Sequence, residues 1–192
     1  MTKTAPLAAV LDANVLYSAA MRDFFMRLAI RFVFQPKWTD EIHEEWIEAV
    51  LRNRPDISRA MLERTRDLMN QYGNDWQVPA YIDLVPTLSL PDPDDRHVLA
   101  AAVASGTPVI VTLNTSDFPE ATLASHGVRA LRPDAFACEL LEVQTERFLR
   151  AVREHRASLK NPPKTVPEYL SSLEVCGLTR TAERLVDYAE EV

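Results

Sequence analysis

The sequence predicts an α/β fold, with a central, mainly parallel sheet flanked by helices and a helical extension at its C-terminal end. Short, continuous apolar runs such as Leu7–Leu11 and Val109–Leu113 are typical of strands that are covered on both faces. Segments with helical periodicity alternate with these runs, which favours a parallel sheet. Beyond residue 132 only helical patterns remain. We therefore expect a domain of residues 1–132 and a helical extension of residues 133–192.

The individual elements follow from apolar periodicity and from turn and capping residues. Strands are predicted at Leu7–Leu11, Ile30–Phe34, Asp83–Val85, Val109–Leu113 and Val128–Leu131. Helices of the first domain are predicted at Tyr17–Ala29, from a cap at Thr39 to about Asn53–Pro55, at Asp56–Tyr72 and at Asp95–Ser105. Helices of the extension are predicted at Ala135–Leu141, Glu146–Leu159, Val166–Val175 and Thr179–Glu190.

Composition limits the class of protein. The chain has 192 residues, of which 47% are hydrophobic, and this is enough to fill a core. It contains no run of eighteen apolar residues, and Met1–Pro6 does not resemble the start of a secretory signal. We expect a cytoplasmic protein without a membrane span. Cys138 and Cys176 lack a CxxC pattern and are expected to be small apolar residues rather than metal ligands or a disulfide.

The formal charge of -7 is unfavourable for holding a polyanion. Carboxylates that surround a bound cation contribute to this count, and the cation reverses the local sign, so the positions of the basic residues matter more than the total. The cations at Arg147, Arg150, Arg153, Arg156, Lys160 and Lys164 recur at roughly helical spacing. They form either a basic stripe or a solvated face paired with Glu146 and Glu154. A second basic group comprises Arg22, Arg27, Arg31 and Lys37.

Acidic and amide side chains gather where strands of the predicted sheet end. Asp12 follows the first buried strand, and Asn114 and Asp117 follow the strand that begins at Val109. Functional groups of open parallel sheets lie beyond the carboxyl ends of the strands, so these residues are expected to lie close together. Hard oxygen ligands without histidine or cysteine suit Mg²⁺ or Mn²⁺ better than zinc.

Further acids lie at the start of one helix and in the middle of another. Asp92, Asp94 and Asp95 precede the alanine-rich helix, and capping explains one or two of them more easily than three. We select Asp95 as the ligand. Glu44 and Glu45 alone would indicate only a solvated helix face. The histidines, His43, His97, His126 and His155, are expected to be surface or supporting groups rather than catalytic ones.

Four blocks, in order, resemble the PIN domain, and specifically the toxin ribonucleases of VapBC-type toxin–antitoxin pairs. They are Leu11–Leu16, Thr39–Trp46, Asp92–Ala102 and Val111–Phe118. Each block is short, but their order and their placement on the predicted elements make the resemblance specific. The resemblance covers roughly Leu7–Leu131 and implies the Rossmann-like PIN fold.

The resemblance implies a site and a chemistry. The family's acids correspond to Asp12, Glu45, Asp95 and a fourth region at Asn114 and Asp117, with Asn14 and Thr112 as supporting polar residues. Asp12, Asp95 and Asp117 would bind Mg²⁺ or Mn²⁺, which activates water for attack on an RNA phosphodiester. Either Glu44 or Glu45 could be the helix glutamate of the family. Either Asn114 or Asp117 could be the fourth ligand.

The same resemblance implies partners. The substrate would be tRNA or another structured RNA, a small antitoxin would hold the enzyme inactive, and the chain would form a homodimer. Some members carry Asp where this chain has Asn114, so a catalytically inactive PIN-fold protein that binds RNA or protein is the alternative.

A phosphatase of the haloacid dehalogenase type would need an aspartate two residues after Asp12. Asn14 stands there, which argues against this class.

Overall fold

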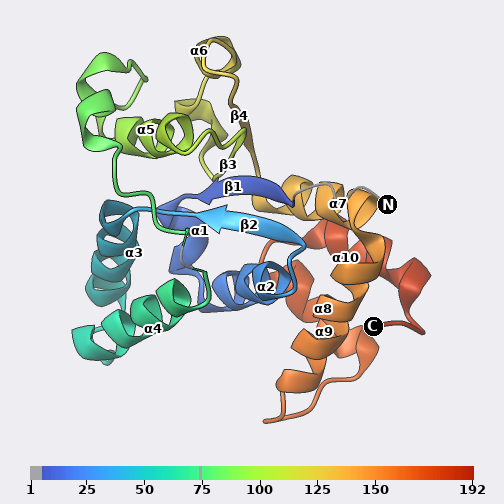
Figure 1. Cartoon of the computed structure of the whole chain (residues 1–192). Coiled ribbons are helices and arrows are strands. Elements are labelled where there is room, and N and C mark those ends of the chain that lie inside the picture. The colour runs from blue at the N-terminus through green and yellow to red at the C-terminus, as the bar shows by residue number, and fades with distance from the viewer. Residues whose placement is uncertain (1–5, 74) are drawn as a thin grey trace. The chain divides into compact units, whose positions relative to one another are not determined.

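The computed structural model of the chain describes residues 6–73 and 75–192 (Figure 1). The predicted absence of a secretory signal concerns Met1–Pro6, of which residues 1–5 lie outside the described residues. The contacts within the chain divide it into two compact units. One unit is the α/β unit, Ala8–Tyr17 and Gln35–Leu131, and the other is the helical unit, which contains Ser18–Phe34 and Arg132–Val192.

A four-stranded sheet with the order β2-β1-β3-β4 is the centre of the α/β unit (Figure 1). The strands are β1 (Leu7–Leu11), β2 (Phe34–Lys37), β3 (Val109–Val111) and β4 (Arg129–Leu131). β3 pairs in parallel with β1 on one side, Val10 opposite Ile110, and with β4 on the other. Val109–Val111 is fully buried, as the continuous apolar run predicts. The predicted parallel sheet is confirmed.

Helices of the α/β unit connect these strands. They are α1 (Ala13–Tyr17), α3 (Asp40–Asn53), α4 (Arg59–Gln71), α5 (Arg96–Ala104) and α6 (Glu120–Ala124), with 3-10 turns η1 (Ile82–Thr87), η2 (Pro93–Asp95) and η3 (Thr115–Asp117). Thr39 caps α3, and its hydroxyl accepts a hydrogen bond of 3.1 Å from the backbone N–H of Ile42. Trp46 and Ile47 on the inner side of α3 are fully buried. α3 therefore has one side fixed in the core and one side open to other contacts.

Two predicted strands were wrong. The segment Ile30–Phe34 contains the end of α2 (Ala19–Ile30) and a turn in which Phe32 has a φ of 57°, so that β2 begins only at Phe34. A β-branched and aromatic composition favours a strand only where the backbone can pair. Asp83–Val85 lies within η1, which buries none of its residues and contains Pro86, a residue without a backbone N–H for a sheet.

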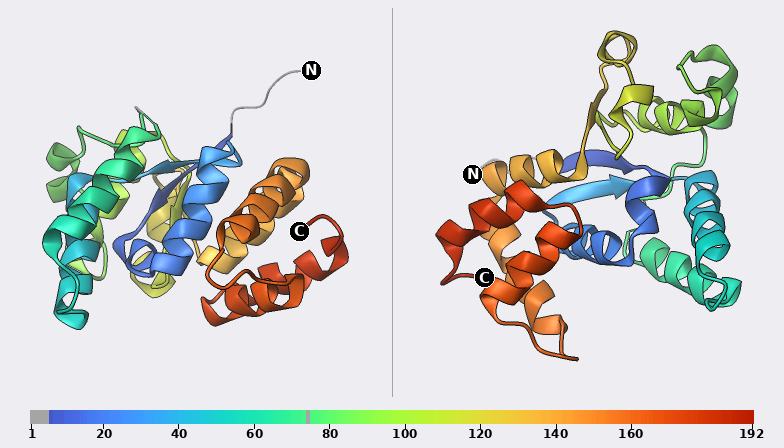
Figure 2. Two further views of the ribbon diagram at one scale, coloured as in Figure 1. Left: turned by 90° about the horizontal axis from the view of Figure 1, so that it is seen from below. Right: turned by 180° about the vertical axis from the view of Figure 1, so that it is seen from behind.

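The helical unit is built from α2 and the C-terminal helices, which are drawn in orange and red in Figure 2. Those helices are α7 (Pro133–Val143), α8 (Thr145–Ser158), α9 (Val166–Val175), α10 (Thr179–Leu185) and the 3-10 turn η4 (Val186–Tyr188). Phe24 of α2 packs edge-on against Phe148 of α8, with ring centroids 6.1 Å apart. Phe25 stacks on Phe136 of α7 at the same separation. The predicted C-terminal helices are confirmed, and they share their core with a helix from the beginning of the chain.

The division of the chain at residue 132 stays a prediction. Both cysteines are free thiols, Cys138 buried and Cys176 half-buried. Among the described residues, no helix is long and apolar enough to cross a membrane.

Candidate metal centre

Asp12 is the most enclosed acid of the α/β unit. It follows β1 directly, and its side chain is 5% exposed. One carboxylate oxygen, Oδ1, accepts a hydrogen bond of 2.7 Å from the backbone N–H of Ala13. The other, Oδ2, accepts bonds from the Asn14 amide at 2.6 Å and from the Thr112 hydroxyl at 2.7 Å. Burial raises the pKa of Asp12, opposed by the bonds from Thr112 and Ala13, and the nearby charge of Glu45 raises it further.

Asn14 and Thr112 join the ends of β1 and β3. The Asn14 amide donates to the Thr112 hydroxyl at 2.9 Å, and its carbonyl oxygen accepts from the backbone N–H of Leu113 at 2.9 Å. The Thr112 hydroxyl in turn accepts from the backbone N–H of Asn114 at 3.0 Å. Parallel pairing of β1 and β3 brings these distant residues together. The Asp12 carboxylate is therefore oriented by side chains that follow two neighbouring strands, Asn14 after β1 and Thr112 after β3.

Asp95 lies at the end of η2, immediately before α5, and its side chain makes no capping hydrogen bond to that helix. Asp92 takes the capping role in this turn, because its carboxylate accepts a bond of 2.9 Å from the backbone N–H of Asp94. Burial raises the pKa of Asp95 to about 6, and the charges of Asp12, Asp92 and Asp117 raise it in the same direction. Asp95 is thus surrounded by negative charge.

Asp117 and Asn114 belong to the turn after β3. The Asn114 amide donates to the Asp117 carboxylate, and the Ser116 hydroxyl donates to the Asn114 carbonyl oxygen at 3.0 Å. Asp117 therefore supplies the carboxylate of this turn, and the Asn114 amide orients it. A cavity of about 480 Å³ adjoins this turn, and its lining residues are Thr115, Ser116, Phe118, Pro119, Glu120, Arg129, Ala130 and Leu131.

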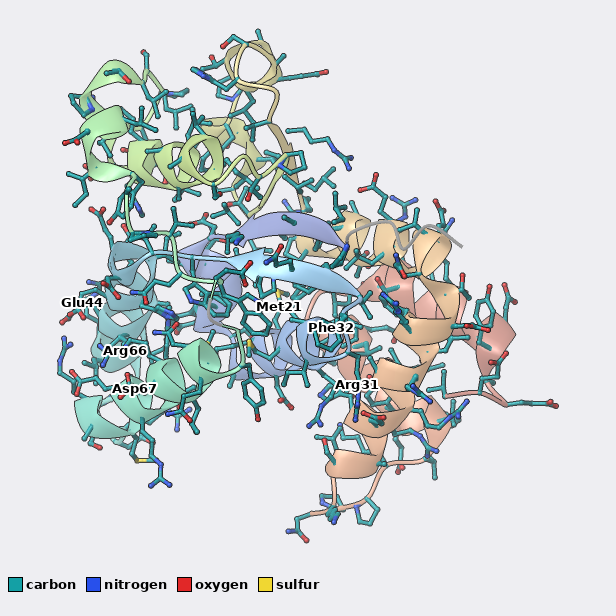
Figure 3. The ribbon with its side chains drawn as sticks, viewed as in Figure 1. Met21, Arg31, Phe32, Glu44, Arg66 and Asp67 are labelled. Atoms are coloured by element: carbon teal, nitrogen blue, oxygen red, sulfur yellow. The ribbon has the colours of Figure 1, made fainter. Side chains whose placement is uncertain are left out.

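Glu44 and Glu45 have different surroundings on α3. Glu44 is 51% exposed, forms an ion pair of 2.9 Å with Arg59, and projects away from the sheet (Figure 3). Glu45 contacts the imidazole of His97, with 3.0 Å between Oε1 and Nε2, and its charge acts on Asp12. Of the two glutamates, Glu45 is therefore the one directed toward the other acids.

The four histidines, all predicted to be surface or supporting groups, lie in different environments. His126 is exposed, whereas His43, His97 and His155 are buried. His155 belongs to the helical unit, where it contacts the Tyr169 hydroxyl at 2.9 Å and Asp23 at 3.1 Å. His97 lies at the site as a supporting group, and its contact with Glu45 was not predicted from the sequence. Its position two residues after Asp95, on the inward side of an alanine-rich helix, was the available signal.

The donor set fits a hard divalent cation. Oxygen is the donor atom throughout. Burial and then the charges of neighbouring acids raise the pKa of Asp95, and a bound cation would relieve the repulsion among these acids. In the part of the chain that the structure describes, no three acidic, histidine or cysteine side chains form a ready-made metal cage. Mg²⁺ commonly keeps several waters and takes only one or two carboxylates directly, so an open arrangement of this kind is suited to it.

Comparisons with known families agree with the observed fold. Residues 8–116 match the family model of the PIN domain, and the chain belongs to that family. Residues 133–187 match a second family model, the VapC50 C-terminal domain. A protein of Mycobacterium tuberculosis (strain ATCC 25618 / H37Rv) named "Putative ribonuclease VapC50" is 37% identical over 79 residues, which are 41% of this chain and 47% of that protein. The chain thus aligns with about half of that relative's length. No solved structure matches the chain.

Proposed function

We propose that this chain is an endoribonuclease dependent on Mg²⁺ or Mn²⁺ and that it acts as the toxin of a toxin–antitoxin pair. The observation that carries the proposal is the buried carboxylate of Asp12, which is fixed by Asn14 and Thr112 and lies within electrostatic reach of Asp95. Membership of the PIN-domain family and the similarity to a protein named as a ribonuclease support it.

Each acid has a distinct role in this proposal. Asp12, Asp95 and Asp117 would hold the cation, and Asn14, Thr112 and Asn114 orient two of these carboxylates. When bound, a divalent cation lowers the pKa of water and stabilises charge on the leaving oxygen. Glu45, half-exposed and close to Asp12, would accept the proton from the attacking water. The phosphodiester is then cleaved without a covalent enzyme intermediate.

The RNA would approach from the side of the turn after β3. The cavity beside Thr115 and Ser116 has hydroxyl groups and an arginine, Arg129, near the apolar side chains of Phe118 and Pro119. Its volume of about 480 Å³ is within the size range of sites for small ligands. It would accommodate a nucleotide next to the scissile phosphate.

The decisive experiment compares Asp12→Asn with the wild type on structured RNA such as tRNA, in Mg²⁺, Mn²⁺ and EDTA. We expect cleavage that EDTA abolishes, and a loss in kcat on the order of a hundredfold or more in the variant, since ligation of the metal contributes several kcal/mol. Glu44→Gln is the matched control, because it removes an exposed carboxylate of α3 that pairs with Arg59. It should retain activity.

Retained cleavage by a folded Asp12→Asn variant would contradict the proposed mechanism. Calorimetry with Mn²⁺ distinguishes the alternative. If the wild type neither binds Mn²⁺ nor cleaves RNA at high protein concentration, a non-catalytic PIN-fold module that binds RNA or protein is favoured.

The toxin role and its partners have separate tests. Induced expression of the wild type in a bacterial host should arrest growth, and Asp12→Asn should not. Co-expression of a small antitoxin from a neighbouring reading frame should restore growth, and the antitoxin should co-purify with the chain.

We also propose that the chain forms a homodimer. Sedimentation of the purified chain would then give twice the mass of 21.7 kDa.

A further inference from the structure

His97 is a buried histidine whose two ring nitrogens each face a glutamate. Its side chain is only 4% exposed and lies between two carboxylates of α3. Nε2 is 3.0 Å from Oε1 of Glu45, and Nδ1 is 3.7 Å from Oε2 of Glu41. Nδ1 is buried and has no hydrogen-bond partner within the described residues. The ring therefore makes a single close polar contact, and that contact is to Glu45.

The chemistry of the two groups determines the direction of this bond. An ionised carboxylate has only acceptors, so Nε2 of His97 must donate to Glu45. Bonds in which the acceptor is ionised are roughly twice as strong as neutral ones, and the buried imidazole has little rotational freedom of its own. A half-exposed glutamate on a helix surface would otherwise sample several rotamers. His97 restricts Glu45 to one of them.

Glu41 faces the other side of the ring without a hydrogen bond to it. The Tyr81 hydroxyl donates to Oε2 of Glu41 at 3.1 Å, and the same oxygen faces Nδ1 of His97. Glu41 and Glu45 of α3 thus face the two nitrogens of His97, and of these two carboxylates only that of Glu45 is within hydrogen-bond distance. Because His97 lies two residues after Asp95 in the chain, its bond to Glu45 connects α3 with the first turn of α5.

We propose that His97 is a positioning residue for Glu45, and that its Nε2–H holds the carboxylate in the orientation in which it accepts the proton from the attacking water. This inference rests on the proposed nuclease function. A buried histidine that merely fills the core is the opposing interpretation. The two differ in one measurable respect, because a positioning residue acts only through Glu45, whereas a core residue acts on stability alone.

A double-mutant cycle on RNA cleavage separates these interpretations. We expect His97→Leu to lower kcat by roughly tenfold to a hundredfold with little change in KM, as removal of a supporting hydrogen bond does at comparable sites. His97→Gln retains a donor and should recover part of kcat. In the background of Glu45→Gln, His97→Leu should cause no further loss. In the background of Glu44→Gln it should cause its full loss.

Two results would overturn the proposal. One is a loss that multiplies with that of Glu45→Gln, and the other is a loss confined to thermal stability. Nitrogen NMR of the imidazole gives a readout that does not require activity: Glu45→Gln should shift the Nε2 signal of His97, and Glu44→Gln should leave it unchanged. An inactive wild type refutes the proposed function, whereas unchanged His97 signals in Glu45→Gln refute the contact itself.

Discussion

Asp12 and Asp95 carry the same functional group in different environments. Asp12 receives hydrogen bonds from Ala13, Asn14 and Thr112, which offset part of the cost of burying its charge. Asp95 has no capping bond and lies among other acids. The raised pKa of Asp95 means that the metal-free protein stores unfavourable electrostatic energy at neutral pH. In the proposed function, a bound cation would offset this unfavourable energy.

Replacement of Asp95 by Asn should stabilise the metal-free protein at pH 7.5. The pKa of Asp95 is raised from its ordinary value of 3.8 to about 6, so the folded state binds the proton more tightly than the unfolded state. The wild type is consequently more stable below the ordinary pKa, and this advantage is lost as the pH rises through about 6. We expect Asp95→Asn to raise the free energy of unfolding by about 1 kcal/mol, a value reduced for partial solvation.

Urea denaturation in EDTA at pH 7.5 and pH 4 measures this effect. The gain should disappear at pH 4, where the folded wild type already carries the proton. Asp94→Asn, at the exposed neighbouring position, is the control and should change stability little at either pH. An equal effect of Asp95→Asn at both pH values would contradict the electrostatic origin.

Among the elements, helix α10 depends on a side chain from another helix for its N-terminal cap. α10 begins without a capping side chain of its own. The Asp134 carboxylate of α7 replaces it, accepting bonds of 2.9 Å from the backbone N–H groups of Arg180 and Thr181, and one of 2.7 Å from the Thr181 hydroxyl. Thr181 is fully buried, so water cannot substitute there. The packing of α7 on α10 thus determines where α10 begins.

Asp134→Ala should destabilise the protein by about 2 kcal/mol, because it leaves helix N–H groups without a charged acceptor. Thermal and urea unfolding would detect this loss. Asp67→Ala is a suitable comparison, since Asp67 is exposed on α4 and pairs with its neighbour Arg66 (Figure 3). A surface pair of this kind contributes about 0–1 kcal/mol. A similar cost for both variants would show that Asp134 has no special capping role.

At the scale of the whole molecule, the helical unit combines segments from both ends of the sequence. α2 contributes Phe24 and Phe25, each at most 1% exposed, and these rings pack on Phe148 and Phe136 from the C-terminal helices. The polar network of His155, Asp23 and Tyr169 connects the same two segments. The C-terminal helices are therefore part of the core around α2.

Removal of residues 133–192 should expose this apolar core. We expect a fragment of residues 1–132 to bind hydrophobic dyes and to unfold at a lower temperature than the full chain. A monomeric fragment as stable as the full chain would contradict this expectation and would support a domain boundary at residue 132.

In the full chain, Phe148→Ala should lower the free energy of unfolding by about 3 kcal/mol, as loss of a large buried ring usually does.

The sequence alone predicts the strand Leu7–Leu11, a strand at Val109–Leu113 of which Val109–Val111 is paired, most helices, and the acids that follow those two strands. These features depend on local properties, namely apolar periodicity, capping residues and the rule that strand ends share one edge of a parallel sheet. The predicted strand Asp83–Val85 failed because a local preference for extended backbone has no effect without a neighbouring strand to pair with.

Contacts between residues that are distant in sequence became known only from the tertiary structure, because local patterns do not encode them. The tertiary structure joined Asp12 to Thr112 across 100 residues, placed Glu45 beside His97 and Glu44 beside Arg59, and assembled α2 with the C-terminal helices. These contacts depend on how strands and helices pack, and residues distant in sequence approach one another only once the core has formed. Periodicity shows which side of a helix is buried, but the identity of the groups that meet there follows from the packed fold.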